Sequence, residues 1–184
     1  MKKTLIFLGV VVLIALWAVG SYNGMVRRRE SIKGAWGQVE NVLQRRYDLI
    51  PNLVETVKGY AAHEKSTLED IAKFRSQWAA APSPSDKMAA SKGLEGALSR
   101  LMVVMENYPQ LKADQSFLKL QDELAGTENR IAVERKRYNE EVQAYNTAAE
   151  TFPGVITARL FGFGPLPYFE APEAAQAAPK VSFQ

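Results

Sequence analysis

The sequence predicts an all-α protein, in which an antiparallel, up-down bundle of three or four long helices is carried on a single N-terminal transmembrane helix. Three observations support this fold class. Apolar residues recur every three or four positions over two long segments, about 30–80 and 114–151, and this is the period of one face of an α-helix. A proline- and serine-rich loop at 79–86 separates the helices. An uncharged apolar run at 4–20 precedes them.

The composition fits one folded domain and excludes several kinds of site. The chain has 184 residues, 47% of them apolar, and this length is typical of one domain. It has no cysteine, which excludes a disulfide framework, a thiolate nucleophile and a cysteine-based metal site. The net charge is +3, but without Lys2 and Lys3 the chain carries 21 basic and 20 acidic residues. We therefore expect no nucleic-acid partner, because such proteins concentrate basic residues on one face.

The apolar run 4–20, TLIFLGVVVLIALWAVG, predicts a membrane anchor. Its seventeen residues are just enough to cross a bilayer and exceed the apolar core of a usual signal peptide. Trp17 and Tyr22 lie near its end, where amphipathic rings prefer the headgroup level. The alternative is a cleaved signal peptide, with Ala18 and Gly20 as a loose small-x-small site. The length of the run favours an uncleaved, single-pass anchor in contact with membrane lipid.

The charges on either side of this run indicate its orientation. Lys2 and Lys3 precede it, whereas Arg27–Arg29 and Lys33 follow it. Lys and Arg are enriched in cytoplasmic flanks, so we expect an outside N-terminus and a cytoplasmic main domain at the cell inner membrane. Arg27–Arg29 either remain solvated beside the membrane or contact anionic headgroups.

The segment 30–80 contains one proline, Pro51, in the middle of a continuous apolar stripe. Pro51 has no N–H to bond the Tyr47 carbonyl. Either one kinked helix passes through it, or a second helix starts there with Ile50 as its N-cap. Isoleucine is a poor cap, and the apolar phase does not slip at Pro51, so we favour one kinked helix. The expected flexing points are glycines, at positions 20, 24, 34 and 37. The stripe consists of Trp36, Val39, Leu43, Tyr47, Ile50, Leu53, Val57, Tyr60, Leu68 and Ile71.

Two further helices follow the loop. Ser83, followed by a proline, predicts the N-cap of a helix over about 84–107. Asp114 or Ser116 then predicts the cap of the last long helix, 114–151, which ends at Phe152-Pro153-Gly154. The spacing along this helix is close to the 3.5-residue period of a coiled coil. Its stripe consists of Phe117, Leu120, Leu124, Thr127, Ile131, Glu134, Tyr138, Val142, Tyr145, Ala149 and Phe152.

The segment after Gly154 has four prolines, at 165, 167, 172 and 179, which exclude long regular structure. It is nevertheless too apolar for a disordered tail. A short amphipathic turn around 157–161 is expected to hold it to the bundle, while the final segment, with Val181 and Phe183, reaches a neighbouring subunit. The sequence thus divides into an anchor (1–24), a helical bundle (25–152) and a Pro/aromatic-rich tail (153–184).

No pattern of catalytic, cofactor-binding or metal-binding residues is present, so we do not expect an enzyme. His63 is the only histidine, and no second imidazole or acidic triplet at helical spacing accompanies it. Two charged groups are more informative, Arg45-Arg46-Tyr47-Asp48 and Glu128-Asn129-Arg130. An antiparallel bundle would set Arg45 or Arg46 against Glu128 or Glu134, and Asp48 against Arg130 or Arg135. Such pairs form a partner surface or fix the register of the bundle.

Several stretches resemble the LemA family of bacterial, membrane-anchored helical proteins. The main one is RRYDLIPNLVETVKGYAAHEKSTLE at 45–69. It is supported by SYNGMVRRRESIKGAWGQVE before it, and by ENRIAVERKRYNEEVQAYN, FP and FGF after it. The resemblance implies a helical membrane protein. It also implies membrane-protein partners, because LemA-like proteins are often encoded beside a membrane metalloprotease or a TPM-domain protein.

We therefore expect a non-enzymatic, membrane-anchored scaffold that self-assembles into a homo-oligomer. The helix 84–107 is too short to cover both long stripes, so apolar surface is left for a second copy. The alternative is an adaptor that presents a helical surface to another membrane protein. The expected interaction residues are Arg45, Arg46, Asp48, Arg130, Phe161, Phe163, Tyr168 and Phe169.

Overall fold

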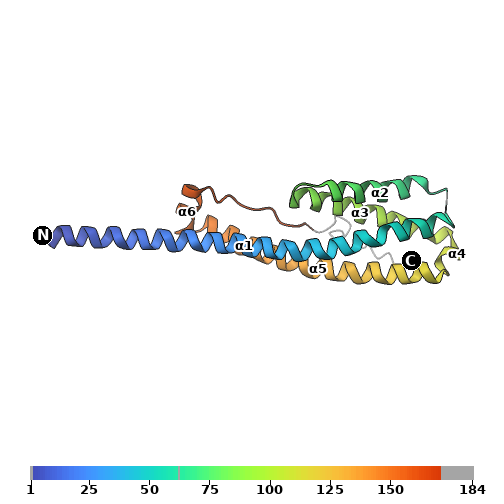
Figure 1. Cartoon of the computed structure of the whole chain (residues 1–184), viewed down its shortest axis with the longest axis horizontal. Helices are drawn as coiled ribbons and strands as arrows, with labels where there is room; N and C mark the ends of the chain where they lie inside the picture. Colours follow the sequence, from blue (N-terminus) through green and yellow to red (C-terminus); the bar gives the residue numbers. More distant parts are fainter. Residues whose placement is uncertain (1, 62, 171–184) are drawn as a thin grey trace, which may run out of the picture. The chain divides into compact units, whose positions relative to one another are not determined.

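The computed structural model describes residues 2–61 and 63–170, and no strand occurs in this part of the chain (Figure 1). The predicted all-α class is confirmed. The elements are α1 (Lys2–Lys58), α2 (Lys65–Ala80), α3 (Pro84–Val104), a 3-10 turn η1 (Met105–Asn107), α4 (Pro109–Lys112), α5 (Gln115–Glu150) and α6 (Gly154–Phe161).

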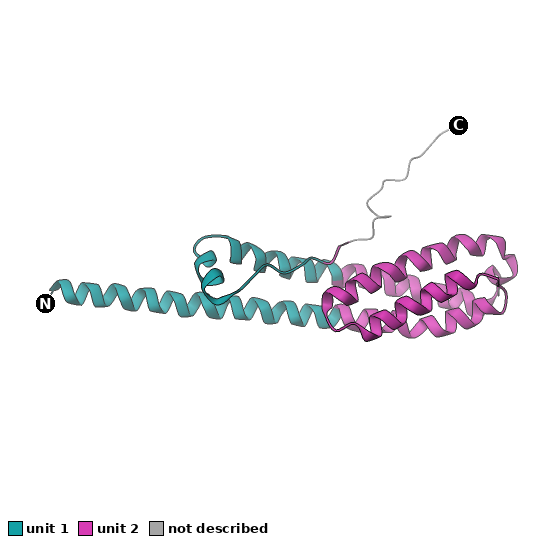
Figure 2. Ribbon diagram, turned by 90° about the horizontal axis from the view of Figure 1, so that it is seen from above, with its two compact units in different colours: residues 1–38, 135–168 teal, residues 39–134, 169–184 magenta. Residues whose placement is uncertain are grey.

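The chain contains two compact units (Figure 2). Unit 1 consists of Met1–Gln38 and Arg135–Tyr168, and unit 2 of Val39–Glu134 and Phe169–Gln184. Both α1 and α5 contribute residues to each unit. This grouping differs from the sequence-based division at residues 24 and 152, which stays a prediction.

Unit 2 is an up-down bundle of four antiparallel segments (Figures 1 and 2). The segments are residues 39–58 of α1, then α2 and α3, and finally residues 115–134 of α5. Every helix turns an apolar face inward, as the periodicity of the sequence predicts. The most deeply buried apolar side chains are Val39, Leu43, Tyr47, Ile50, Leu53, Ile71, Leu94, Leu101, Leu111, Phe117 and Ile131.

The helix predicted over about 30–80 ends early, at Lys58. A turn follows, in which the amide of Tyr60 bonds the Val57 carbonyl at 3.0 Å, and α2 begins at Lys65. Gly59 is a poor helix residue and favours a turn here. The apolar spacing resumes after the turn because α2 packs on the same core as α1, so the periodicity gives no sign of the reversal.

This turn also corrects the expected shortage of partner helices. The prediction counted only the helix 84–107 against the two long stripes. In unit 2, α2 is a further partner, with Leu68, Ile71 and Trp78 buried. Apart from Tyr60, which is 42% exposed, every residue of the two predicted stripes between 39 and 134 is buried or half-buried within one chain. In this part of the chain, the surplus of apolar stripe surface expected from the sequence is limited to Tyr60.

Pro51 lies inside α1, so the single-helix alternative is confirmed. The carbonyl of Tyr47, which loses its usual partner because proline has no N–H, instead accepts a bond from Nε of Arg75 at 3.3 Å. A side chain of α2 thus satisfies the group that the proline exposes. Glycines 20, 24, 34 and 37 do not interrupt α1 either; the chain reverses between α1 and α2 instead.

The predicted helix caps of α3 and α5 are confirmed. Ser83 Oγ accepts the amide of Asp86 at 3.2 Å, one turn into α3. Asp114 Oδ1 accepts the amide of Phe117 at 2.8 Å, at the start of α5. Both caps satisfy amides that lack a partner within the helix. Together they set where the chain enters the third and fourth segments of unit 2.

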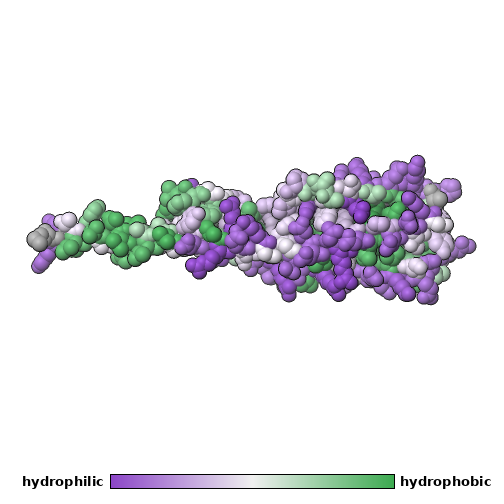
Figure 3. All heavy atoms as spheres, in the orientation of Figure 1, coloured by the Kyte–Doolittle hydropathy of each residue, from purple (hydrophilic) through white to green (hydrophobic). Residues whose placement is uncertain are grey.

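Unit 1 contains residues 2–38 of α1, residues 135–150 of α5, α6 and the segment 162–168. Its interior includes Met25, Ile32, Tyr138, Val142, Tyr145 and Ala149. In the described part of the chain, α1 is the one helix with a stretch long and apolar enough to cross a membrane. The apolar side chains of this stretch are exposed (Figure 3).

The predicted stripe of α5 is buried over most of its length, with one exception at its end. Tyr138, Val142 and Tyr145 are each less than 5% exposed. Phe152, however, is 81% exposed. Helix α5 ends at Glu150, and the Phe152–Pro153 peptide bond that follows is cis. The helical period no longer applies beyond Glu150, so Phe152 does not join the stripe.

Candidate functional site

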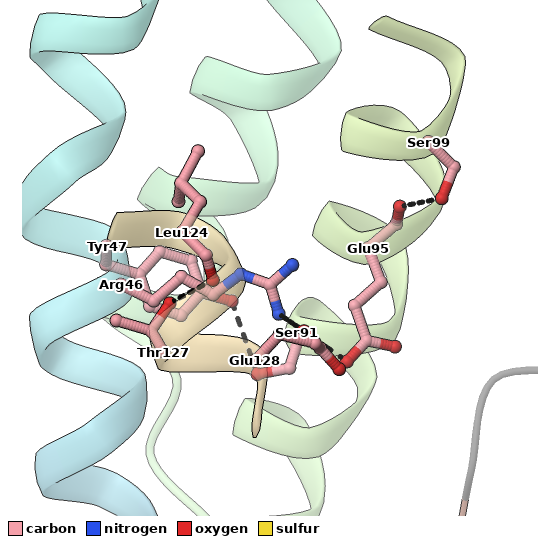
Figure 4. Close-up of polar contacts among 8 residues, drawn as sticks. All are labelled: Arg46, Tyr47, Ser91, Glu95, Ser99, Leu124, Thr127 and Glu128. Atoms are coloured by element: carbon pink, nitrogen blue, oxygen red, sulfur yellow. Dashed lines mark hydrogen bonds and ion pairs between the residues drawn. The ribbon is translucent and has the colours of Figure 1, made fainter. Parts of the chain in front are cut away.

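The predicted interaction residues lie in both units. In unit 2, Arg46 is buried at 7% exposure, and its guanidinium lies between two carboxylates (Figure 4). Its Nη1 is 2.6 Å from Glu128 Oε2 on α5 and 3.7 Å from Glu95 Oε1 on α3. The predicted pairing of Arg46 with Glu128 is thus confirmed. One cation from α1 connects three helices.

Glu95 is the member of this cluster that the sequence did not indicate. It follows the buried Leu94 and lies at the edge of the apolar face of α3. From the sequence alone, a glutamate at that position cannot be distinguished from one that faces solvent. The packing of α3 beside α1 is what brings Glu95 close to Arg46. A buried ion pair is costly to desolvate and chiefly specifies alignment. The burial of Arg46 favours the register of the bundle over a partner surface as the role of this cluster.

Tyr47 adds a neutral hydrogen-bonding group beside this cluster. Its hydroxyl lies 3.3 Å from Ser91 Oγ on α3, and its ring stacks on Trp78 of α2 with centroids 4.4 Å apart. Burial raises the pKa of Tyr47 to about 12, although Ser91 and Arg46 act in the opposite direction. The phenol therefore stays protonated at neutral pH. Tyr47 belongs to the interior of the bundle.

The other charged residues of the prediction lie on the surface of unit 2. Arg45, Asp48 and Arg130 are exposed. Asp48 accepts a bond from Nε2 of Gln44, on its own helix, at 2.7 Å, in place of the predicted pairing with Arg130 or Arg135. The structure thus separates this group into one buried residue, Arg46, and three that face solvent. Their role in an interaction stays a prediction.

Two tyrosines connect the turns at one end of unit 2. Tyr60 donates to Asp114 Oδ2 at 2.9 Å, and Tyr108 donates to Glu64 Oε1 at 3.1 Å. The amide of Phe117, and then the Tyr60 hydroxyl, hold the pKa of Asp114 below its usual value. These contacts join the turn after α1 to the connection before α5. They were missed because the turn itself was not predicted.

His63 lies in this same turn and is exposed. Its neighbour Glu64 is engaged by Tyr108. Across residues 2–61 and 63–170, no group of three His, Asp or Glu side chains is arranged to hold a metal ion.

In unit 1, the tail is fastened to α5 by side chains that bond its backbone. Asn146 makes two such bonds to Leu166, donating to its carbonyl and accepting its amide, each at 2.9 Å. Tyr145 donates to the Gly164 carbonyl at 3.0 Å, and Tyr138 donates to the Pro167 carbonyl at 3.2 Å. The tail has no regular structure to satisfy its carbonyls, so α5 supplies the donors.

The four aromatic residues predicted for the tail have different surroundings. Phe163 is buried in unit 1, with its ring centroid 5.6 Å from that of Tyr22 and 5.5 Å from the guanidinium carbon of Arg29. Phe169 is buried in unit 2. Phe161 and Tyr168 are 56% and 46% exposed. Val181 and Phe183, which were predicted to reach a neighbouring subunit, lie outside the described residues.

The residues that hold the tail were missed at the level of sequence, although a signal was present. A proline-rich segment leaves carbonyls without partners, and Tyr138 and Tyr145 are seven residues apart on one face of α5. Such polar tips on an apolar stripe indicate a nearby acceptor. The sequence does not show which of several carbonyls is bonded.

Comparison with known proteins places these features in a family. The chain is 25% identical over 174 residues to the magnetosome protein MamQ of Magnetospirillum gryphiswaldense, an alignment that covers 80% of this chain and 64% of the relative. It is 26% identical over 175 residues to magnetosome protein MamQ 1 of Paramagnetospirillum magneticum, covering 81% and 64%. The chain thus spans less than two thirds of the length of these magnetosome proteins.

A shorter relative is covered more fully. Protein LemA of Metamycoplasma hominis is 25% identical over 159 residues, covering 84% of this chain and 71% of the relative. The LemA family itself matches residues 35–183. This range includes all four helical segments of unit 2 and nearly all of the tail. Together with the exposed apolar stretch of α1, these matches indicate membrane association. The chain therefore belongs to the LemA family and is a membrane-associated helical protein.

Proposed function

We propose that this chain is a non-enzymatic, membrane-anchored helical scaffold that self-assembles into a homo-oligomer. The observation that carries the proposal is the continuity of α1. This helix of 57 residues contains both the exposed apolar stretch and the first segment of the bundle. A bundle that is closed on its own core suits a structural or binding role. The buried polar residues described above serve its register and its turns.

Self-assembly has its own support in unit 1. Phe161 and Tyr168 remain about half exposed, although exposed aromatic rings are costly in water. Anchoring copies in one membrane raises their local concentration, so a weak contact between them suffices. We propose that these two residues contact a neighbouring copy whose membrane helix has the same orientation.

The adaptor role is the second candidate, and one observation favours it. The core of unit 2 is covered within a single chain, so its outer surface does not require a second copy. Arg45, Asp48 and Arg130 lie on that surface. We propose that they would meet another membrane protein, such as a membrane protease or a TPM-domain protein.

Cross-linking in intact membranes distinguishes these two roles. A photo-reactive amino acid is placed at Tyr168 and, as a control of similar exposure, at Leu118 on α5. Self-assembly predicts a product of two copies from position 168 and little from position 118. A product with a different protein from either position favours the adaptor. If full-length protein in mild detergent is also a monomer, self-assembly is refuted.

We further propose that the main domain is cytoplasmic and that the membrane is the inner membrane of the cell. The support is the excess of Arg and Lys after the apolar stretch. A phosphatase that is active only outside the cytoplasm is fused after Gln184. The orientation predicts an inactive fusion, and an active one would show that the charge bias misled us.

A further inference from the structure

Helix α6 leaves an apolar face without a partner in unit 1. Thr157 and Ala158 point into the unit and are buried. Ile156 and Leu160, four residues apart on the opposite face, are 42% and 74% exposed, and Phe152 just before the helix is 81% exposed. Figure 3 shows this apolar surface over α6. Such an arrangement of apolar residues is unusual for a surface in water.

The position of α6 along α1 identifies the environment of this face. The hydroxyls of Thr157 and Ser21 are 2.7 Å apart, and the ring centroids of Phe161 and Tyr22 are 5.0 Å apart. Ser21 and Tyr22 directly follow the apolar run 4–20. Helix α6 is thus held against the residues at which α1 leaves the run.

The length of the run places these residues at the edge of the bilayer. At about 1.5 Å per residue the run rises roughly 26 Å, whereas the hydrocarbon core is about 30 Å thick. The difference of about 4 Å corresponds to about three residues, so the core extends beyond the run to the neighbourhood of Tyr22. Contacts with Ser21 and Tyr22 put α6 at the boundary between hydrocarbon and headgroups.

Basic side chains flank the apolar face. Arg28 lines one groove beside α6, together with Ser21 and Phe152. Arg159 lines a second groove, which also contains Glu150. Arginine on the border of an apolar helix face is typical of helices that lie in the membrane interface, where the guanidinium reaches the headgroup phosphates.

We propose that α6 is a second membrane contact: Phe152, Ile156 and Leu160 enter the boundary of the lipid acyl chains, while Arg28 and Arg159 face the headgroups. The anchor then has two parts, a spanning stretch of α1 and an interfacial helix fastened to it. The spanning stretch alone leaves the chain free to rotate about its axis. With α6 in the interface, this rotation is restricted, because the side of α1 that carries α6 must face the lipid surface. This inference rests on membrane anchoring, and the contact between copies proposed above uses Phe161 and Tyr168, which are not part of this face.

Because the chain has no cysteine, a single introduced cysteine carries a unique fluorescent probe. Full-length protein with Leu160→Cys is labelled and reconstituted at low density in vesicles of phosphatidylcholine and phosphatidylglycerol. The matched control is Val103→Cys on α3, because Val103 is 72% exposed and Leu160 is 74% exposed. Both residues are apolar and exposed, so neither change should prevent folding.

We expect lipids brominated near the headgroup end of their acyl chains to quench the probe at 160 several-fold more than the probe at 103. Aqueous iodide should show the reverse order. Equal quenching of both probes by iodide would overturn the proposal. A probe at 160 that is shielded from iodide and from brominated lipid would also overturn it, because a second copy would then cover α6. Carbonate extraction of the same vesicles tests the membrane anchor separately.

Discussion

The two units bury their polar groups in different ways. In unit 2, apolar faces from four helical segments close a core, and the buried Arg46 is paired with carboxylates from two other helices. In unit 1, two helices have no further long helix to pack on, and the tail is held by bonds from Tyr138, Tyr145 and Asn146 to its backbone. Unit 1 also leaves Phe152, Leu160 and much of α1 exposed.

This difference indicates what each unit depends on. The core of unit 2 is complete within the chain, so its stability should be insensitive to lipid. Unit 1 exposes apolar surface that water does not favour, so a membrane should stabilise it. Substitutions that remove core packing should therefore act on unit 2 in any solvent. Those that remove tail contacts should act locally on unit 1.

The largest effect is expected from a cavity in the core of unit 2. Ile131→Ala, at a fully buried position, should lower the free energy of unfolding by about 2–5 kcal/mol. The matched control is Val133→Ala on the same helix, where the side chain is 50% exposed and the cost should be about 0.5 kcal/mol or less. Urea unfolding of the full chain in mild detergent, followed by helical circular dichroism, measures both. Equal costs at the two positions would contradict a closed core.

The Arg46 cluster should give the next largest effect. Arg46→Ala removes the buried guanidinium that faces Glu95 and Glu128, and we expect a loss of about 3 kcal/mol in unfolding free energy. Glu128 is 41% exposed, so water partly solvates its carboxylate when the guanidinium is removed. Combining Arg46→Met with Glu95→Gln and Glu128→Gln should recover most of the loss, because no charge is then left buried. If the triple variant is less stable than Arg46→Ala, the cluster does more than fix register.

Alkaline pH offers a third test of the interior of unit 2. Burial raises the pKa of Tyr47 to about 12, so its neutral form is favoured in the folded state. The resulting stability is complete below pH 10 and is lost as the pH rises from 10 to 12, by about 2–3 kcal/mol at 1.36 kcal/mol per pKa unit. Tyr47→Phe should lose less over this range. Unfolding curves of both proteins at pH 8 and pH 11 would show the difference, and parallel losses would rule it out.

The smallest effect should come from the tail. Asn146→Ala removes two bonds to Leu166, at about 1–2 kcal/mol in local stability. We expect faster amide hydrogen exchange at Leu166, with unchanged exchange in α2 and α3 of unit 2. The control is Gln143→Ala, at an exposed position on the same helix. Faster exchange in α2 or α3 as well would show that the tail supports more than unit 1.

The local features of the fold were predictable from sequence. The periodicity indicated α3 and α5 close to their observed bounds, and Ser83 and Asp114 identified their caps. One long-range contact, Arg46 with Glu128, was among the predicted pairings of Arg45 or Arg46 with Glu128 or Glu134, because an antiparallel bundle brings these two charged groups together. The turn between α1 and α2 was not predicted. A single glycine is a weak signal, and apolar spacing is the same on both sides of a helical hairpin.

By itself the sequence determined the helical class, the apolar stretch of α1 and the residues that face a core. These depend on interactions between residues a few positions apart, which the chain order displays directly. Only the tertiary structure decided that Glu95 joins Arg46, that Arg75 bonds the carbonyl exposed by Pro51, and where the tail lies on α5. Each of these selects one partner among several chemically equivalent groups. That selection depends on how the helices pack, because the packing brings one donor within reach of one acceptor.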